Sequence, residues 1–200
     1  MTGIGKFINL ASELQPIPMG ILVSVVMGMA LTAPISSAAI AISLDLSGLA
    51  AGAATVGCCV NMLGFAVASY RENGVGGLIS QGLGTSMLQM PNILRNPRIW
   101  IAPTLASAVT GPLATCLFHL EMNGPAVSSG MGTCGLVGQI GVYTGWLNDI
   151  AAGTRTAILP MDWLGLALIC FVLPAILSLI FCWILRRLGW VKPGDMKLAD

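Results

Sequence analysis

The side chains best suited to bind a solute gather between residues 119 and 139, beside a glycine-rich stretch. The candidates for contacting a substrate are His119, Glu121, Asn123, Ser128, Ser129 and Gln139. They offer imidazole, carboxylate, amide and hydroxyl groups, all of which hydrogen-bond polar solutes. Pro125 disfavours a helical conformation at Gly124, and a broken helix end frees backbone groups for a bound solute. We predict a solute site here; the alternative is that His119 and Glu121 only mark the outer membrane interface.

The sequence does not favour dinucleotide binding, metal binding or hydrolysis. Residues 130–135 match G-x-G-x-x-G but lack the strand and βαβ context of a dinucleotide site. The six cysteines lie in apolar stretches without C-x-x-C spacing, so we expect neither a zinc site nor disulfides. The carboxylates are too scattered for hydrolytic acid–base work. We expect no metal or cofactor, and any catalysis would involve a second protein, which leaves open whether the chain is an enzyme.

The composition indicates that a membrane surrounds these residues. Of 200 residues, 56% are apolar and only 8% are charged, whereas a soluble domain carries about 25% charge. So few charges cannot cover a water-facing surface. The net charge of +1 gives no electrostatic reason to bind nucleic acid. We therefore predict an all-α polytopic membrane protein that forms a single membrane domain over residues 1–200.

Four runs with few or no charges are long enough to cross a bilayer, which takes about 20 mainly apolar residues. The predicted spanning helices cover about residues 19–43, 48–70, 99–120 and 163–185. The last run is the least ambiguous, because tryptophans suited to interfacial anchoring lie near both of its ends.

Two further uncharged runs are rich in glycine and unlike lipid-facing helices, because glycine costs about 1 kcal/mol per position in a helix interior. Non-helical backbone is tolerated at membrane depth only where protein or a water-filled cavity surrounds it. We therefore predict that residues 122–148 form a re-entrant hairpin. Residues 73–94 are predicted to be a second re-entrant or interfacial segment.

The basic residues predict an orientation. If the first span enters from the cytoplasm and both glycine-rich segments return to the side they left, eight of the nine Lys and Arg residues are cytoplasmic. Only Arg155 is then outside. Because cytoplasmic loops carry the excess of Lys and Arg, four spans with both termini in the cytoplasm are expected.

Four other features leave alternatives open. Asp45 is either a solvated loop residue or a substrate or ion ligand. Pro34 is expected to kink the first span, either facing the same cavity or in a structural role. The basic segment formed by Arg95 and Arg98 with Pro91, Pro97 and Pro103 either anchors lipid headgroups or docks a soluble partner. Small residues from Gly48 to Gly57 predict close helix packing, within the bundle or against a second chain.

Several segments of the sequence resemble the phosphotransferase-system enzyme IIC family, including its perfringolysin-regulator-like subgroup. The segments that carry the resemblance are GIG (3–5), PIPMGIL (16–22), PISSAAIAI (34–42), SGLAAGAA (47–54), MPN (90–92) and GLVG (135–138). Members of this family are usually longer, so the chain resembles the C-terminal half of an enzyme IIC bundle.

The resemblance implies a sugar permease that binds and translocates sugar for phosphorylation by a soluble IIB partner. A His and a Glu near the hairpins would hold the sugar hydroxyls, which by position implies His119 and Glu121. It also implies membrane lipid as a neighbour, a bacterial inner-membrane location, and a homodimer or pairing with a separate N-terminal half. The alternative function is a non-transporting membrane regulator or sensor related to the perfringolysin regulator.

Overall fold

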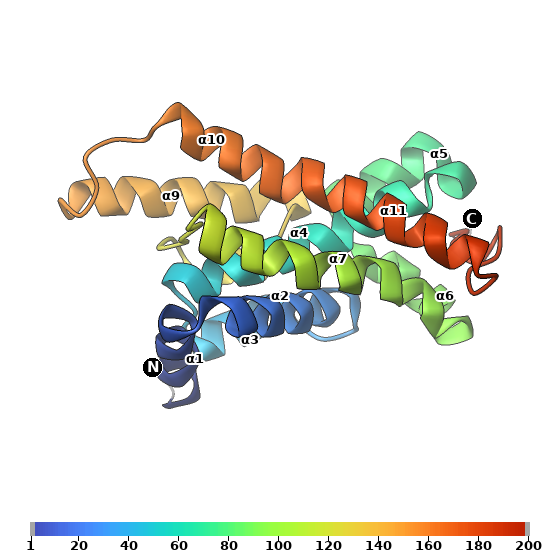
Figure 1. The fold of residues 1–200 in the computed structure, drawn as a ribbon, viewed down its shortest axis with the longest axis horizontal. Coiled ribbons are helices and arrows are strands. Elements are labelled where there is room, and N and C mark those ends of the chain that lie inside the picture. Colours follow the sequence, from blue (N-terminus) through green and yellow to red (C-terminus); the bar gives the residue numbers. More distant parts are fainter. Residues whose placement is uncertain (1–2, 199–200) are drawn as a thin grey trace.

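A computed structural model describes residues 3–198, which form a bundle of helices around one central helix (Figure 1). The central helix is α4 (Gly48–Ala68), and most of its residues are buried. The helices packed against it are α2 (Pro16–Thr32), α7 (Ile101–Pro112) and α11 (Leu173–Arg187). Glycine permits this close approach, because a Cβ at Gly57 would collide with the backbone carbonyl of Ser24. The small residues of α4 therefore serve close packing within the bundle.

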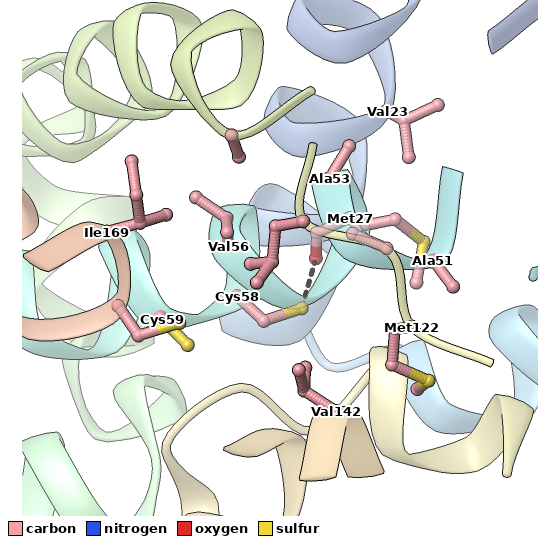
Figure 2. Packing of buried hydrophobic residues seen from close by; sticks show 14 of the residues in the cluster. Val23, Met27, Ala51, Ala53, Val56, Cys58, Cys59, Met122, Val142 and Ile169 are labelled. Carbon is pink, nitrogen blue, oxygen red and sulfur yellow. Dashed lines mark hydrogen bonds between the residues drawn. The ribbon is translucent and has the colours of Figure 1, made fainter. Parts of the chain in front are cut away.

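The hydrophobic core consists of side chains from several elements gathered around α4 (Figure 2). Val56 of α4 is buried in the same cluster as Val142 and Ile169. Cys58 also lies in this core, where its Sγ donates to the Met27 carbonyl at 3.5 Å. All six cysteines are free thiols.

Within residues 3–198, three continuous helices are long and apolar enough to cross a membrane. They are Gly48–Ala68, Pro97–Leu117 and Pro160–Arg187. The second joins η3 (Pro97–Trp100), α7 and a π-helical turn η4 (Leu113–Leu117), and the third joins α10 (Pro160–Ala167), η6 (Leu168–Val172) and α11. These helices coincide closely with three predicted spans, and the all-α polytopic fold class is confirmed.

The region 19–43, predicted to be one helix, is divided between two helices. It contains most of α2 and then α3 (Ser37–Leu44), and α3 runs back along α2, because Leu44 at its end lies beside Met19 near the start of α2. Ala33, which precedes Pro34, is extended (φ −68°, ψ 159°), and the Ser36 side chain accepts from the backbone of Ala39 at 3.2 Å to begin α3. The expected kink is thus a reversal. It returns Asp45 to the end of the bundle that holds α1 (Gly3–Leu14).

Residues 118–151 form a hairpin that enters the bundle and turns back. At its entry, Met122 N donates to the Gly48 carbonyl at the start of α4 (3.1 Å). The short helices α8 (Ala126–Ser129) and η5 (Cys134–Leu136) lead to its innermost part, where Thr133 reaches Met62. Helix α9 (Val137–Ala151) then returns towards the start of α4.

The second glycine-rich segment begins at the other end of α4. It comprises α5 (Tyr70–Ile79), η1 (Ser80–Gly84), η2 (Ser86–Gln89) and α6 (Met90–Arg95). Its η1 turn packs against α4, and the Gly82 carbonyl accepts a 2.6 Å hydrogen bond from Thr133 Oγ1. Two glycine-rich segments that start at opposite ends of α4 therefore meet inside the bundle.

The charged residues separate between the two ends of the bundle. We call the end where α4 begins the acidic end, which holds Glu13, Asp45, Glu121, Asp149 and Asp162 with Lys6 and Arg155. We call the end where α4 finishes the basic end, which holds Arg71, Arg95, Arg98, Arg186, Arg187, Lys192 and Lys197 with Glu72 and Asp195.

The two termini lie at opposite ends of the bundle, the N-terminus at the acidic end and the C-terminus at the basic end (Figure 1). This arrangement differs from the predicted layout, in which both termini share one side. The structure has two helices that reverse at Pro34 where one helix was predicted over 19–43, and this accounts for the difference.

Candidate functional site

A pocket of about 420 Å³ opens at the acidic end. Its lining residues are His119, Glu121, Asn123, Asp149, Thr154 and Arg155. Small-molecule sites commonly have volumes of about 300–1,000 Å³. The structure thus brings together three of the six residues predicted from the sequence to contact a solute: His119, Glu121 and Asn123.

His119 and Glu121 expose their side chains from the segment that connects η4 to α8. Leu120 and Met122 alternate with them and are buried, so the two polar side chains point outward. Leu120 N donates to the Ala114 carbonyl at 2.9 Å, which fixes this alternation. Within residues 3–198, neither His119 nor Glu121 has a side-chain hydrogen-bond partner. Their imidazole and carboxylate groups are available to a ligand.

The side chain of Asn123 forms hydrogen bonds to two different walls of the pocket. Its Oδ1 accepts from the backbone of Gly48 at 3.1 Å, and its Nδ2 donates to both carboxylate oxygens of Asp149 at 3.1 and 3.2 Å. The side chain of Asn123 therefore ties the start of α4 to the end of α9. It holds the Asp149 carboxylate at the pocket and has little capacity left for a ligand.

The remaining pocket residues were not predicted from the sequence. Thr154 Oγ1 donates to the Asp149 carbonyl at 2.9 Å. Arg155 forms an ion pair with Asp162, and its guanidinium lies 5.3 Å from the centre of the Trp146 ring. The sequence did hold one indication that Arg155 is special, because it is the one basic residue that the predicted layout places outside the cytoplasm. The sequence does not show that it lies beside His119.

A second pocket of about 360 Å³ adjoins the first and shares His119 and Arg155 with it. Its other walls include the aromatic side chains of Phe118 and Trp146. The acidic end thus combines charged and hydrogen-bonding groups with aromatic surface.

The other three predicted residues lie within the hairpin. Ser128 and Ser129 are buried, and Ser129 Oγ donates to the Ala126 carbonyl of its own turn at 2.7 Å. Gln139 Nε2 donates to Cys59 Sγ at 3.2 Å, whereas its Oε1 is buried with no hydrogen-bond partner among the described residues. None of the three lines the pocket. They pack the arms of the hairpin against each other and against α4.

Sequence reasoning also missed a buried polar cluster between α2, α4 and α7. Asn61 Nδ2 donates to Ser107 Oγ at 3.1 Å, and Ser24 Oγ donates to the Ser107 carbonyl at 2.9 Å. Asn61 was a usable signal, since polar side chains inside spanning helices commonly bond to neighbouring helices. This cluster joins three helices of the bundle.

An all-helical bundle with membrane-length helices and charges segregated to its ends defines a polytopic membrane protein. The chain belongs to the phosphotransferase system EIIC family, since the family model described as "Phosphotransferase system, EIIC" matches residues 1–198. No match was found among curated proteins or among solved structures. The resemblance to enzyme IIC is therefore confirmed at the level of the family. The subgroup and the half-bundle interpretation stay predictions.

Proposed function

We propose that this chain binds and translocates a sugar as the membrane component of a phosphoenolpyruvate-dependent phosphotransferase system. Membership of the EIIC family supports a permease component. The observation that carries the proposal is the pocket of about 420 Å³ in which His119 and Glu121 face an open space beside Asp149. Sugar hydroxyls both donate and accept hydrogen bonds, so they suit a pocket that mixes carboxylates with imidazole and guanidinium donors.

We further propose that the three long helices cross the membrane with the basic end in the cytoplasm. Seven of the nine Lys and Arg residues lie at that end, and cytoplasmic loops carry the excess of Lys and Arg. The pocket would then face the outside, from which sugar arrives. A cysteine placed at Lys6 should react with an impermeant thiol reagent in intact cells, and one at Lys192 only in opened cells. The opposite pattern would contradict this orientation.

In this orientation both glycine-rich segments are re-entrant. The hairpin 118–151 would enter from outside, and the segment 70–95 would enter from the cytoplasmic side. Their contact at Thr133 and Gly82 would separate the two sides of the protein. Because surrounding helices cover the irregular backbone of both segments, neither has to expose unpaired backbone groups to lipid.

The partner that completes the reaction would be a soluble IIB component, which donates its phosphoryl group to the sugar at the cytoplasmic side. The seven basic residues at that end would attract a phosphorylated protein. Many large apolar side chains are exposed along the bundle. Such surface suits contact with membrane lipid and with a second copy or a separate N-terminal half.

The test of sugar binding compares Glu121→Gln with Glu13→Gln. Both changes remove one exposed carboxylate at the acidic end, but only Glu121 lines the pocket. A panel of radiolabelled sugars first identifies the one taken up. A hydrogen bond to a charged group contributes about 1.5–3 kcal/mol, so Glu121→Gln should weaken sugar affinity by at least about tenfold. Equal affinity in the two variants would remove the pocket from the mechanism.

A further inference from the structure

A groove at the basic end takes no part in the proposed sugar site. It lies between α4, α5 and α11 and has a volume of about 490 Å³. Its apolar walls include Val67, Leu78, Leu179 and Trp183. Leu179 and Trp183 are 48% and 55% exposed, so the groove opens on the outer surface of the bundle. A membrane-spanning bundle presents this surface to lipid.

Basic side chains border the same groove. Arg71 and Arg186 line it, and the Arg187 guanidinium lies 4.1 Å from the centre of the Trp183 ring. Glu72 is the carboxylate beside them, and it pairs with Arg186 Nη2 at 2.9 Å. Three guanidinium groups and one carboxylate leave the border positively charged.

Two of these arginines have unused hydrogen-bonding capacity. Arg186 Nη2 also donates to the Ala68 carbonyl at 3.1 Å, but its Nε is buried with no hydrogen-bond partner within residues 3–198. The Arg71 side chain is exposed and has no ion pair or hydrogen bond in the described part of the chain. The groove therefore joins apolar walls to two guanidinium groups: Arg71, which has no partner within residues 3–198, and Arg186, which is paired only through Nη2.

We propose that this groove binds an anionic phospholipid, with an acyl chain against the apolar walls and the phosphate at Arg71 and Arg186. Guanidinium groups bind phosphate oxygens through paired hydrogen bonds, and basic pockets between membrane helices bind anionic headgroups. A free phosphate would leave Leu179 and Trp183 uncovered. A zwitterionic lipid would bring its own cation to the arginines. An anionic phospholipid fits both the walls and the charge, and it would join α5 to α11.

The test uses the purified full chain in a non-ionic detergent and measures thermal unfolding during titration with three probes. Phosphatidylglycerol should raise the unfolding temperature saturably. Phosphatidylcholine, which has the chains but a zwitterionic headgroup, should not. Glycerol 3-phosphate, which has the phosphate without chains, should not either. An equal rise with phosphatidylcholine, or with glycerol 3-phosphate, would overturn the proposal in favour of chain binding or of a plain phosphate site.

Matched variants locate the binding site. Arg71→Gln should weaken phosphatidylglycerol binding about tenfold, whereas Arg95→Gln should leave it unchanged, because Arg95 is an exposed arginine at the same end that does not line the groove. Leu179→Trp should fill the groove and weaken binding. Ile180→Trp, at a neighbour with 47% exposure outside the groove, should not. If Arg71→Gln and Arg95→Gln weaken lipid binding equally, or if the two tryptophan variants do, the lipid is not bound in this groove and the proposal is overturned.

Discussion

The two ends of the bundle both carry many polar side chains, but they use them differently. At the basic end the amides bond to one another: Gln89 Nε2 donates to Gln81 Oε1 at 2.8 Å, and Asn92 Nδ2 donates to Gln89 Oε1 at 2.9 Å. At the acidic end His119 and Glu121 have no side-chain partner within residues 3–198 and face a pocket. Polar side chains in the two glycine-rich segments therefore differ in role: those at the basic end bond to one another, and those at the acidic end stay available to a ligand.

The C-terminal residues complete the network at the basic end. The Met196 carbonyl accepts from Gln89 Nε2 at 2.9 Å and from Asn73 Nδ2 at 2.8 Å, and Met196 N donates to Glu72 at 2.9 Å. Val191 and Met196 are buried in a second hydrophobic cluster with Ile93. These internal bonds join the glycine-rich segment 70–95 to the C-terminal residues and fix the shape of that part of the basic end.

The comparison teaches that polarity alone does not identify a binding site. Buried amides that satisfy one another stabilise the fold, whereas polar groups that a rigid scaffold leaves unpaired can bind a ligand. Substitutions at the basic end should therefore lower the free energy of unfolding, whereas substitutions at the acidic end should lower sugar affinity. A substitution where the two glycine-rich segments meet should affect both.

The largest effect is expected for Gly132→Val, next to the contact between the two glycine-rich segments. Gly132 has φ +55°, and a Cβ there would lie 2.7 Å from the Cys58 backbone. Left-handed strain of about 1–2 kcal/mol and overpacking of about 1–3 kcal/mol should together lower the free energy of unfolding by about 3 kcal/mol. Thermal unfolding in detergent measures the loss.

Gly135→Val is the matched control. Gly135 has φ +52°, but the nearest atom to its added Cβ is 3.9 Å away, so this variant should show only the backbone strain. Equal losses in the two variants would mean that the close packing of the hairpin against α4 contributes nothing measurable.

A smaller effect is expected for Glu72→Gln at the basic end. The change breaks the ion pair with Arg186 and weakens the bond to Met196 N. A fully buried pair costs about 3–5 kcal/mol to break, and the partial exposure of Arg186 should reduce this to about 2 kcal/mol. Thermal unfolding should show the loss while sugar affinity is unchanged. A loss of sugar affinity without a loss of stability would reverse the roles assigned to the two ends.

The smallest of the three stability effects is expected for Asn123→Ala at the acidic end. It removes the bonds to Gly48 and Asp149 and should cost about 1–2 kcal/mol. Because Asp149 loses its anchor, sugar affinity should fall as well. The control is Asn148→Ala, which removes one exposed 3.3 Å bond to the Asn123 carbonyl. If affinity survives Asn123→Ala, the Asp149 carboxylate is not needed at the pocket.

The sequence predicted the three long apolar helices correctly. The runs at 48–70, 99–120 and 163–185 have the length and apolarity of spanning helices, and the structure has a long helix over each. Glycine content also distinguished residues 73–94 and 122–148 from these runs. Such features depend on local composition and bilayer thickness, which a single chain displays directly.

The candidate site was predicted only in part. His119 and Glu121 stood out because two titratable groups precede a Gly-Pro break in an apolar chain. Asp149 and Arg155 did not, because they follow about thirty residues later and reach the pocket through the return of α9. Gln139 and Ser129 looked equally polar in sequence, but their bonding partners became visible only in the fold.

By itself the sequence determined that the chain is an all-helical membrane protein and that two glycine-rich segments differ from its long apolar helices, because composition and length suffice for both. Tertiary structure decided the direction of the chain after Pro34. A proline there is compatible with a kink or with a reversal, and contacts with distant segments select the reversal, such as the 2.6 Å bond from Ser37 Oγ to the Gly130 carbonyl. Tertiary structure also decided which polar groups are paired, since hydrogen-bond partners depend on positions in space that residue spacing does not encode.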